Sequence, residues 1–343
     1  MRAIYLTLCW ICMSGQALAT DWYPVDVLAD GVSQQYQPLP NAAKPWRICA
    51  LLPHGKDRYW WGVAWGLDEE ATRQGVRLGI YEARGYENPQ VQAQQLQNCQ
   101  QRNADAYVIA AIDAQGLCTA IAQLVEQGKP VIDLVNGIDC PGLSASSSVD
   151  FADMTGAALA YIDNHRPSGP FSLGWLPGPQ GAGWVLDSER ALRQAEQVKP
   201  LTVQHGGYAP VDRASQAQLV RELLRQHPHL DFLLGNAEAA GFAAQLVQTS
   251  GQNYRAQVLA TYTTERIVEQ IRDGFNVAAP TDSPVLQARI AVDLAVRALE
   301  GRSHAQRVSP LIEMLDQGSL AQFDISRLMP PPEHWMIRRE LPQ

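Results

Sequence analysis

The sequence lacks the motifs of the common hydrolytic and metal-dependent enzymes. It contains neither a GxSxG nor an SxxK nucleophile motif, no glycine-rich phosphate loop and no HExxH. Its CxxC, formed by Cys9 and Cys12, lies in the apolar start of the chain, and the histidines are scattered without the spacing of metal ligands. We therefore expect a protein that is not an enzyme, with no structural metal site and no cofactor.

Long apolar segments and an excess of basic charge are also missing. No run reaches the roughly 18 uninterrupted apolar residues that span a bilayer. The 27 Lys and Arg residues are outnumbered by 35 Asp and Glu residues, which gives a net charge of −8 at pH 7. This balance argues against nucleic acid and against an anionic membrane surface as partners. We expect a mature chain that neither binds nucleic acid nor inserts into a membrane.

The first residues have the three parts of a secretory signal peptide. A short basic start at Met1-Arg2 precedes an apolar run from Ala3 to Met13, and Ala17-Leu18-Ala19 supplies the small residues of a cleavage site. We predict a signal peptide over residues 1–19 and an exported mature chain that begins near Thr20.

The remaining cysteines are Cys49, Cys99, Cys118 and Cys140. An even number in an oxidising compartment favours disulfides, with three possible pairings. Cys49 falls in the first predicted strand, and Cys99 falls near the end of a helix expected to cover the same sheet. Cys118 lies on the next helix and Cys140 in a later loop. We favour the pairs Cys49–Cys99 and Cys118–Cys140, and the alternative is that the thiols are free and buried.

Short apolar strands alternate with helical segments through most of the chain. This alternation indicates βαβ units and parallel sheets covered on both faces. Strands are predicted over residues 47–52, 77–82, 106–110, 131–135, 172–176, 201–206, 232–235, 258–261, 276–279 and 309–315. Helices are predicted over residues 59–74, 89–102, 116–126, 152–163, 183–197, 214–226, 238–248, 264–273 and 285–299.

A chain of 343 residues exceeds what one hydrophobic core usually supports. The pattern predicts an α/β protein in which two doubly wound parallel-sheet lobes are joined by a hinge, the type I periplasmic-binding-protein architecture. We assign residues 46–140 plus about 280–310 to lobe 1 and residues 141–279 to lobe 2. Residues 20–45 are expected to form an irregular N-terminal arm, and residues 311–343 to cross back or to pack on the surface.

Aromatic and acidic residues gather just after the predicted strands. Ligands of open α/β sheets bind at the carboxyl ends of strands, so these positions define the candidate cleft. The residues concerned are Asp57, Tyr59, Trp60, Glu82, Tyr86, Trp184, Tyr262 and Asp282, with Phe151 at the crossover between the lobes.

Each of these residues also has an ordinary structural interpretation. Asp57 could be only a helix N-cap, and Tyr59 and Trp60 could only pack on the sheet. We assign Trp61 and Trp65, which follow on the same helix, to the core. Trp184 is interpreted as structural. Asp282 is interpreted as a turn cap, Asp133 as a strand-end partner and Asp139 as a loop acid.

Six segments resemble the TorT family of periplasmic proteins, which serve in sensing trimethylamine N-oxide. The most specific segment is Trp46-Arg47-Ile48-Cys49-Ala50-Leu51-Leu52 running into Lys56-Asp57-Arg58-Tyr59-Trp60, and the others are 82–86, 134–139, 176–183, 227–231 and 281–282. The resemblance extends over residues 46–301. It implies a periplasmic, bilobed, non-enzymatic protein that binds trimethylamine N-oxide and docks on the periplasmic sensor domain of a TorS-type histidine kinase.

The resemblance also implies a ligand-binding set, namely Asp57, Tyr59, Trp60, Tyr86 and Tyr262, with Phe151 where the family has a tryptophan. The methylated nitrogen of trimethylamine N-oxide has no N–H, so aromatic faces and a carboxylate must hold it. Its oxygen is a strong acceptor that needs a donor such as a tyrosine hydroxyl. A phenylalanine face attracts a cation less than a tryptophan face does, and it lacks the indole N–H.

Other functions stay open from the residues alone. A periplasmic binding protein for a sugar, or for another methylated amine such as a betaine, could feed an ABC transporter. A sugar site usually adds several Asp, Asn and Arg side chains to its stacking rings, whereas this cleft has more rings than paired polar groups.

Overall fold

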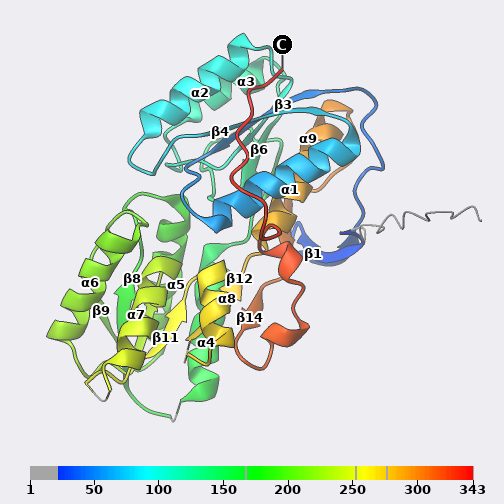
Figure 1. Cartoon of the computed structure of the whole chain (residues 1–343). Coiled ribbons are helices and arrows are strands. Elements are labelled where there is room, and N and C mark those ends of the chain that lie inside the picture. Colours follow the sequence, from blue (N-terminus) through cyan, green and yellow to red (C-terminus); the bar gives the residue numbers. More distant parts are fainter. Residues whose placement is uncertain (1–21, 167, 252, 276, 343) are drawn as a thin grey trace, which may run out of the picture.

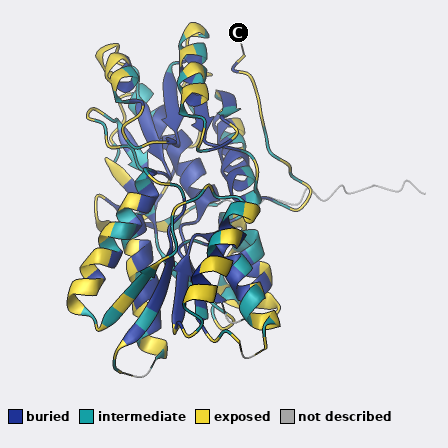
Figure 2. Ribbon diagram, turned by 90° about the vertical axis from the view of Figure 1, so that its left-hand side faces the viewer, coloured by how far each residue is buried: buried dark blue, intermediate teal, exposed yellow. Residues whose placement is uncertain are grey.

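Two β-sheets, each covered by helices on both faces, organise the chain (Figure 1). The computed structural model describes residues 22–342 except 167, 252 and 276, so the predicted signal peptide lies outside the described residues. The central strands of both sheets are buried, while the helices expose their outer faces (Figure 2). The predicted fold class is confirmed.

The larger sheet has eight strands in the order β2-β1-β13-β7-β6-β5-β3-β4 among the described residues. The strands β3, β4, β5, β6 and β7 are parallel neighbours, with β3 paired to both β4 and β5. Their bounds are β1 Val25–Ala29, β2 Val32–Tyr36, β3 Arg47–Leu52, β4 Arg77–Glu82, β5 Ala106–Ile109, β6 Val131–Leu134, β7 Ala145–Ser147 and β13 Arg307–Pro310.

Helices α1 and α9 cover one face of this sheet, and α2 and α3 cover the other. Their bounds are α1 Arg58–Gln74, α2 Pro89–Gln101, α3 Cys118–Glu126 and α9 Pro284–Leu299. Helix α1 begins at the N-cap Asp57 and ends at Gly75, whose φ of 75° is the left-handed conformation that favours glycine. Helices α1 and α9 can approach closely because Gly66 has no side chain. A Cβ at this position would lie 2.5 Å from the carbonyl oxygen of Val285.

The smaller sheet has six strands in the order β14-β12-β11-β10-β8-β9 within the described part of the chain. Helices α4 and α5 lie on one face, and α6, α7 and α8 lie on the other. The bounds are α4 Phe151–His165, β8 Phe171–Leu176, α5 Gly183–Val198, β9 Leu201–His205, α6 Arg213–Gln226, β10 Phe232–Gly235, α7 Ala237–Thr249, β11 Gln257–Ala260, α8 Glu265–Arg272, β12 Val277–Thr281 and β14 Glu313–Leu315.

The prediction of an irregular N-terminal arm is wrong for the described residues. Strands β1 and β2 form an antiparallel hairpin, and β1 also pairs with β13, so the segment is part of the larger sheet. The hairpin turns at Asp30-Gly31, both with positive φ (49° and 80°). An Asp-Gly pair between alternating apolar residues is a strong hairpin signal, and Val25, Val27 and Ala29 supply that alternation.

The predicted single strand over residues 309–315 is also wrong. The segment is divided between β13 in the larger sheet and β14 in the smaller sheet, where Leu315 pairs with Ala279 of β12. Pro310 lies at the end of β13, and proline cannot donate to the next rung of a sheet. The chain thus passes between the sheets after β7, after β12 and again after β13.

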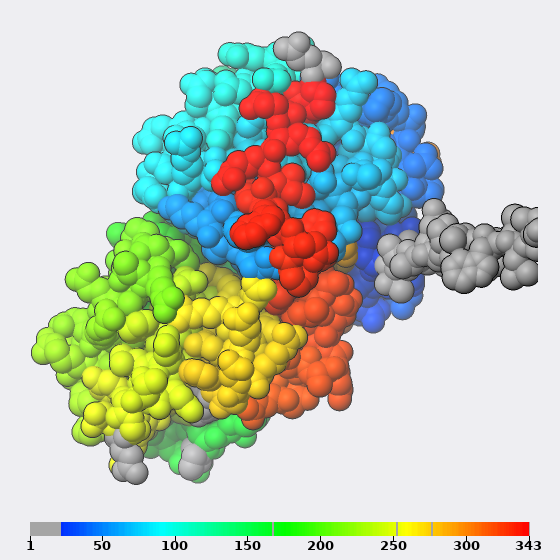
Figure 3. Space-filling view, in the orientation of Figure 1, coloured from blue at the N-terminus to red at the C-terminus, as the bar shows by residue number. Residues whose placement is uncertain are grey.

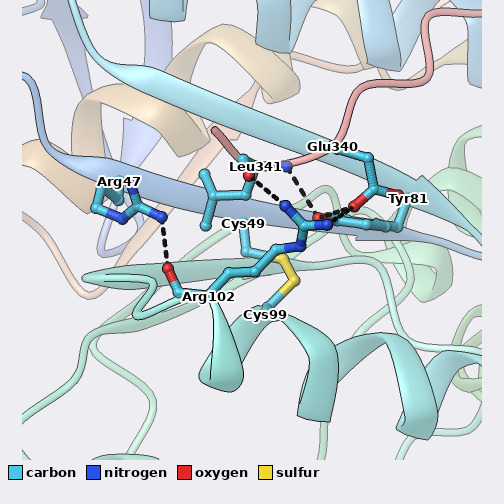
Figure 4. The surroundings of a disulfide bond; sticks show 7 residues. All are labelled: Arg47, Cys49, Tyr81, Cys99, Arg102, Glu340 and Leu341. Carbon is cyan, nitrogen blue, oxygen red and sulfur yellow. Dashed lines mark hydrogen bonds and ion pairs between the residues drawn. A yellow bond between two sulfur atoms is a disulfide. The ribbon is translucent and has the colours of Figure 1, made fainter. Parts of the chain in front are cut away.

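The C-terminal residues return to the larger sheet and run over its surface (Figure 3). Arg339 forms an antiparallel bridge with Ile80 of β4, and the side chain of Leu341 is fully buried. The guanidinium of Arg102 forms an ion pair with Glu340 at 2.8 Å and donates to the carbonyl of Leu341 at 2.9 Å (Figure 4). The described part of residues 311–343 therefore pairs first with β12 of the smaller sheet and then, through Arg339, with β4 at the edge of the larger sheet.

Two disulfides join the pairs that the sequence favoured, Cys49 with Cys99 and Cys118 with Cys140. The first ties β3 to the end of α2 beneath the C-terminal segment (Figure 4). Within residues 22–342, no helix is both long and apolar enough to cross a membrane.

Substitution of Gly79 tests how tightly the C-terminal segment packs on β4. A Cβ at Gly79 would lie 2.8 Å from the backbone nitrogen of Leu341, and backbone cannot move aside cheaply. Gly79→Ala should therefore displace the segment and lower the free energy of unfolding by about 1–3 kcal/mol. Limited proteolysis of residues 330–342 and urea unfolding measure both effects.

Gly156→Ala is the matched control. Gly156 lies within α4 with nothing inside 4 Å of its added Cβ, so alanine should leave the stability unchanged or raise it by about 1 kcal/mol. A Gly79→Ala chain that resists proteolysis as well as the Gly156→Ala chain would contradict this account of the packing.

Candidate functional site

The loops that follow the strands of both sheets enclose a small cavity. Its volume is ≈ 30 Å³. The lining residues come from the ends of β3, β4, β6, β9 and β11 and from the first turns of α1, α4 and α5. They are His54, Asp57, Tyr59, Trp60, Tyr86, Val135, Asn136, Phe151, Trp184, Val211 and Tyr262. All of the predicted ligand-binding residues are therefore brought together here.

Asp57 is both a helix cap and a wall of this cavity. One carboxylate oxygen accepts the backbone N–H of Trp60 at 3.1 Å, which caps α1. The other lies 3.9 Å from Nδ1 of His54, and the side chain keeps 34% of its exposure. Burial lowers the pKa of His54, so the imidazole is neutral at pH 7 and does not neutralise Asp57. Asp57 therefore both caps α1 and lines the cavity.

Aromatic rings from both lobes meet around the cavity in edge-to-face and tilted contacts. Tyr59 and Tyr262, which come from opposite sheets, have ring centroids 5.6 Å apart at 67°. Tyr262 contacts Trp184 at 5.8 Å, and Trp184 contacts Phe151 at 5.8 Å. Trp60 completes this side, 5.3 Å from Tyr59. We call Tyr59, Trp60, Tyr86, Phe151, Trp184 and Tyr262 the aromatic cage.

The cage tyrosines differ in the partners of their hydroxyl groups. Tyr59 donates to Oδ2 of Asp282 at 2.5 Å, and Tyr86 donates to Oδ1 of Asn136 at 3.2 Å. No acceptor for the Tyr262 hydroxyl lies within hydrogen-bonding geometry among the residues described. Burial raises the pKa of all three phenols, so each keeps its proton at neutral pH. Tyr262 is therefore the cage tyrosine with a free hydroxyl hydrogen.

Backbone strain marks the cage wall between the lobes. Val135 has a φ of 64°, a left-handed conformation that is an outlier for a β-branched residue. Opposite it, a Cβ at Gly183 would lie 2.6 Å from the carbonyl oxygen of Asn136, so the lobes touch directly at this point. Such strain persists only where the surrounding structure holds it, and it concentrates at functional sites.

Sequence reasoning missed several residues of the cavity. Trp184 was assigned a structural role, yet its indole lies in the cage wall. The glycine at position 178 was a possible signal, because its missing side chain leaves room for the ring: a Cβ there would lie 2.5 Å from Trp184. His54 and Asn136 follow strands but lacked any distinguishing motif. Trp61 is half-buried against Trp335 rather than in the core, whereas Trp65 is buried.

Asp282 and Asp133, the two acids predicted near strand ends, have different surroundings. Asp282 is fully buried behind Tyr59 and accepts from Nε2 of Gln287 at 2.8 Å, and Asp133 is buried within β6. In the described part of the chain, no group of three or more His, Cys, Asp or Glu side chains is arranged to hold a metal ion.

Comparison with known proteins places these features in a family. A model of the periplasmic binding protein domain matches residues 48–303. The periplasmic protein TorT of Escherichia coli (strain K12) is 30% identical over 295 residues, which cover 85% of this chain and 84% of TorT.

Solved structures of two kinds are also similar. A solute-binding protein of an ABC transporter from Bradyrhizobium sp. BTAi1, with bound Bis-Tris, has a TM-score of 0.79 and 36% identity, covering 93% of this chain and 99% of its own. The complex of the TorS sensor domain with TorT, solved without ligand and with trimethylamine N-oxide, has a TM-score of 0.75 and 27% identity. It covers 85% of this chain and 99% of the matched chain.

Asp282 gives the site a predictable pH dependence. Burial raises the pKa of its carboxyl group to about 6, above the roughly 3.9 of an unfolded chain. The folded state thus holds this proton more tightly, so the stability that the proton contributes is present at low pH and is lost as the pH rises from about 4 to about 6. Asp282→Asn removes this loss. The difference in free energy of unfolding between Asp282→Asn and the native chain should therefore shift by about 2 kcal/mol in favour of the variant when the pH is raised from about 4.5 to about 7.5.

Urea unfolding at both pH values measures the difference. Asp26→Asn, which alters an exposed acid, is the control and should keep the pH dependence of the native chain. The interpretation fails if Asp282→Asn and Asp26→Asn respond to pH alike.

Proposed function

The chain belongs to the periplasmic binding protein family and is a homologue of TorT, and we propose that it is a periplasmic receptor for trimethylamine N-oxide. In this proposal the bound state is reported to the sensor domain of a TorS-type histidine kinase, and the protein itself catalyses no reaction. The observation that carries the proposal is the aromatic cage, closed by rings from both lobes around a cavity with one carboxylate at its edge.

The cage suits a cation that has no hydrogen to donate. Aromatic faces attract a methylated ammonium at about 0.5–2 kcal/mol for each desolvated contact. Several contacts together are enough for micromolar binding after the cost of association. In the proposed complex Trp60, Tyr86, Phe151 and Tyr262 pack on the methyl groups, and Asp57 supplies the negative charge. Trp184 joins this set, although the sequence did not indicate it.

The oxygen atom of the ligand needs a donor, and the hydroxyl of Tyr262 supports this role. The hydroxyls of Tyr59 and Tyr86 already donate to Asp282 and Asn136, so those two residues serve as walls. An N-oxide oxygen carries a formal negative charge, and a hydrogen bond to it is about twice as strong as one between neutral groups.

The size of the cavity favours a small ligand. A space of ≈ 30 Å³ accommodates only a few water molecules in this arrangement of the lobes. Betaine and choline carry additional atoms beyond the trimethylated nitrogen, and a sugar requires more polar partners than this cavity offers. We therefore rank trimethylamine N-oxide above betaine and choline, and these above ribose.

Ligand binding would favour the closed arrangement of the lobes. The contact of Tyr59 with Tyr262 and the ion pair of Arg58 with Glu265 both join the first turn of α1 to the opposite lobe. A ligand that touches rings of both lobes binds the closed state better than the open state, and only such a difference shifts the equilibrium. The kinase domain would read this shift at the surface.

The proposed location is the periplasm, with the mature chain beginning near Thr20 after removal of residues 1–19. Both the family and TorT are periplasmic. The TorT and TorS complex supports a kinase as partner. A hinge between the lobes is proposed to lie where the chain leaves β7 and β12.

Delivery of a ligand to an ABC transporter is the second candidate. Its support is the 36% identity to the solute-binding protein of such a transporter, whose bound Bis-Tris is a tertiary amine carrying hydroxyl groups. The cage would serve this function equally well with a somewhat different amine.

Calorimetry with the mature chain tests the ligand. We expect micromolar binding of trimethylamine N-oxide, weaker binding of betaine and choline, and no binding of ribose. Trp60→Ala should weaken the affinity for trimethylamine N-oxide by about thirtyfold, since it removes one desolvated cation–π contact. Binding of ribose without binding of trimethylamine N-oxide would overturn the proposal.

The control for Trp60→Ala is Trp335→Ala, because Trp335 keeps 72% of its exposure and lies outside the cavity. Its affinity and its thermal transition should match those of the native chain. An equal loss of affinity in both variants would show that the effect does not arise in the cage.

A binding assay separates the two candidate functions. The mature chain should form a complex with the periplasmic sensor domain of the TorS-type kinase from the same organism, as judged by size-exclusion chromatography with light scattering. No complex with and without trimethylamine N-oxide, together with stimulation of transport by a cognate ABC transporter, would favour the second candidate.

A further inference from the structure

A second, larger cavity lies beside the aromatic cage. Its volume is ≈ 810 Å³, and it shares only Val135 with the cage. One wall is formed by the loops after β5 and β6 and by the segment around β7, and the facing wall is formed by α5 of the other lobe. None of its lining residues is a Phe, Tyr or Trp. We call it the polar cavity.

Carboxylates outnumber basic groups in the polar cavity. The acids are Asp113, Asp133, Asp139, Asp150 and Asp187, and the bases are Arg190 and Arg307. Both arginines are already engaged: Arg190 lies 2.8 Å from Asp187, and both lie within 3.9 Å of Asp150. None of the remaining three acids forms an ion pair with these two arginines.

Asp133 is the feature that points to a ligand. It belongs to β6, with parallel neighbours on both sides, and only 4% of the residue is exposed. Its Oδ1 atom has no hydrogen-bond partner among the described residues. A buried carboxylate oxygen without a partner is costly, and native proteins rarely tolerate one unless a ligand or ion satisfies it. Burial raises the pKa of Asp133 to about 7, although the backbone N–H groups of Ile138 and Gly137 and the charge of Arg307 act in the opposite direction.

The chemistry of the walls distinguishes the ligand from that of the cage. Carboxylates and the hydroxyls of Ser146 and Ser148 accept hydrogen bonds, so they suit a cation that donates them. A methylated cation cannot donate. A metal ion needs several carboxylates converging on one point, and the described residues offer no such group. A volume of ≈ 810 Å³ has room for an extended cation.

We propose that the polar cavity is a second ligand site, which takes a small organic cation with primary amino groups, a diamine or polyamine, and holds one ammonium group on Asp133. Asp113 and Asp139 receive the rest of the positive charge from the loops of lobe 1. The site is distinct from the cage, because the walls of the two cavities share only Val135.

Calorimetry with putrescine and spermidine at about 150 mM salt tests the proposal, since this salt screens loose surface attraction. We expect saturable binding of one molecule per chain. Asp133→Asn should weaken it at least tenfold, because the neutral amide cannot replace an ionised partner. The bis-trimethylammonium analogue of putrescine, which has the same charges but no N–H, should bind at least tenfold more weakly than putrescine.

Two variants separate this site from the cage and from general effects of charge. Trp60→Ala should keep its affinity for spermidine while it loses affinity for trimethylamine N-oxide. Asp26→Asn removes an exposed acid elsewhere and should bind spermidine as the native chain does. Should Asp133→Asn fail to fold, Asp113→Asn at the rim, which is exposed, is expected to weaken binding severalfold.

The proposal is overturned by any of three results. These are no binding of either amine up to millimolar concentration, equal affinity of Asp133→Asn and Asp26→Asn, and equal affinity for putrescine and its methylated analogue. Binding of Mg²⁺ or Ca²⁺ that depends on Asp133 and displaces spermidine would replace the amine by a metal ion and overturn it as well.

Discussion

The hydrogen bond from the Tyr59 hydroxyl to Asp282 fixes the geometry on which the cage depends. It joins the first turn of α1 to the crossover between β12 and α9. The acceptor is fully buried, and its other oxygen, Oδ1, has no partner among the described residues. Losing the Tyr59 donor would leave Oδ2 with a single hydrogen bond, from Nε2 of Gln287, at a cost of about 0.5–1.5 kcal/mol. Tyr59 is therefore held with its ring against Tyr262, and the cage is assembled around a ring that cannot turn.

The two cavities on either side of Val135 are lined by different kinds of side chain. The aromatic cage offers rings and a single acid, whereas the polar cavity offers acids and hydroxyls without rings. In the two proposals, cations without N–H donors bind in the cage and cations with N–H donors bind in the polar cavity, so the lining groups rather than the charge separate them. The strained backbone of Val135 places its side chain between the two cavities, so the division depends on one residue in an unfavourable conformation.

The strand ends could be predicted from the sequence because buried parallel strands are short apolar runs with helices between them. This pattern located Asp57, Tyr59, Trp60, Tyr86 and Tyr262 near one edge. It could not separate Trp184 from a packing residue, because an indole after a glycine turn serves either purpose. Nor could it reveal the orphaned oxygen of Asp133, since an acid in a strand looks the same whether or not its partner is present. The Asp30-Gly31 pair does predict a hairpin, but the flanking prolines and polar residues favour a loop.

Neither sheet is built from a continuous piece of chain, and this has a consequence for the order of folding. Strand β13 lies between β1 and β7, and β14 closes the edge of the smaller sheet beside β12. The N-terminal hairpin therefore has no neighbour on its inner side until residue 307 has been synthesised. Non-local pairing of this kind slows folding. Within the described residues, both sheets therefore stay incomplete until residues 307–315 are available, and folding of both lobes is completed late along the chain.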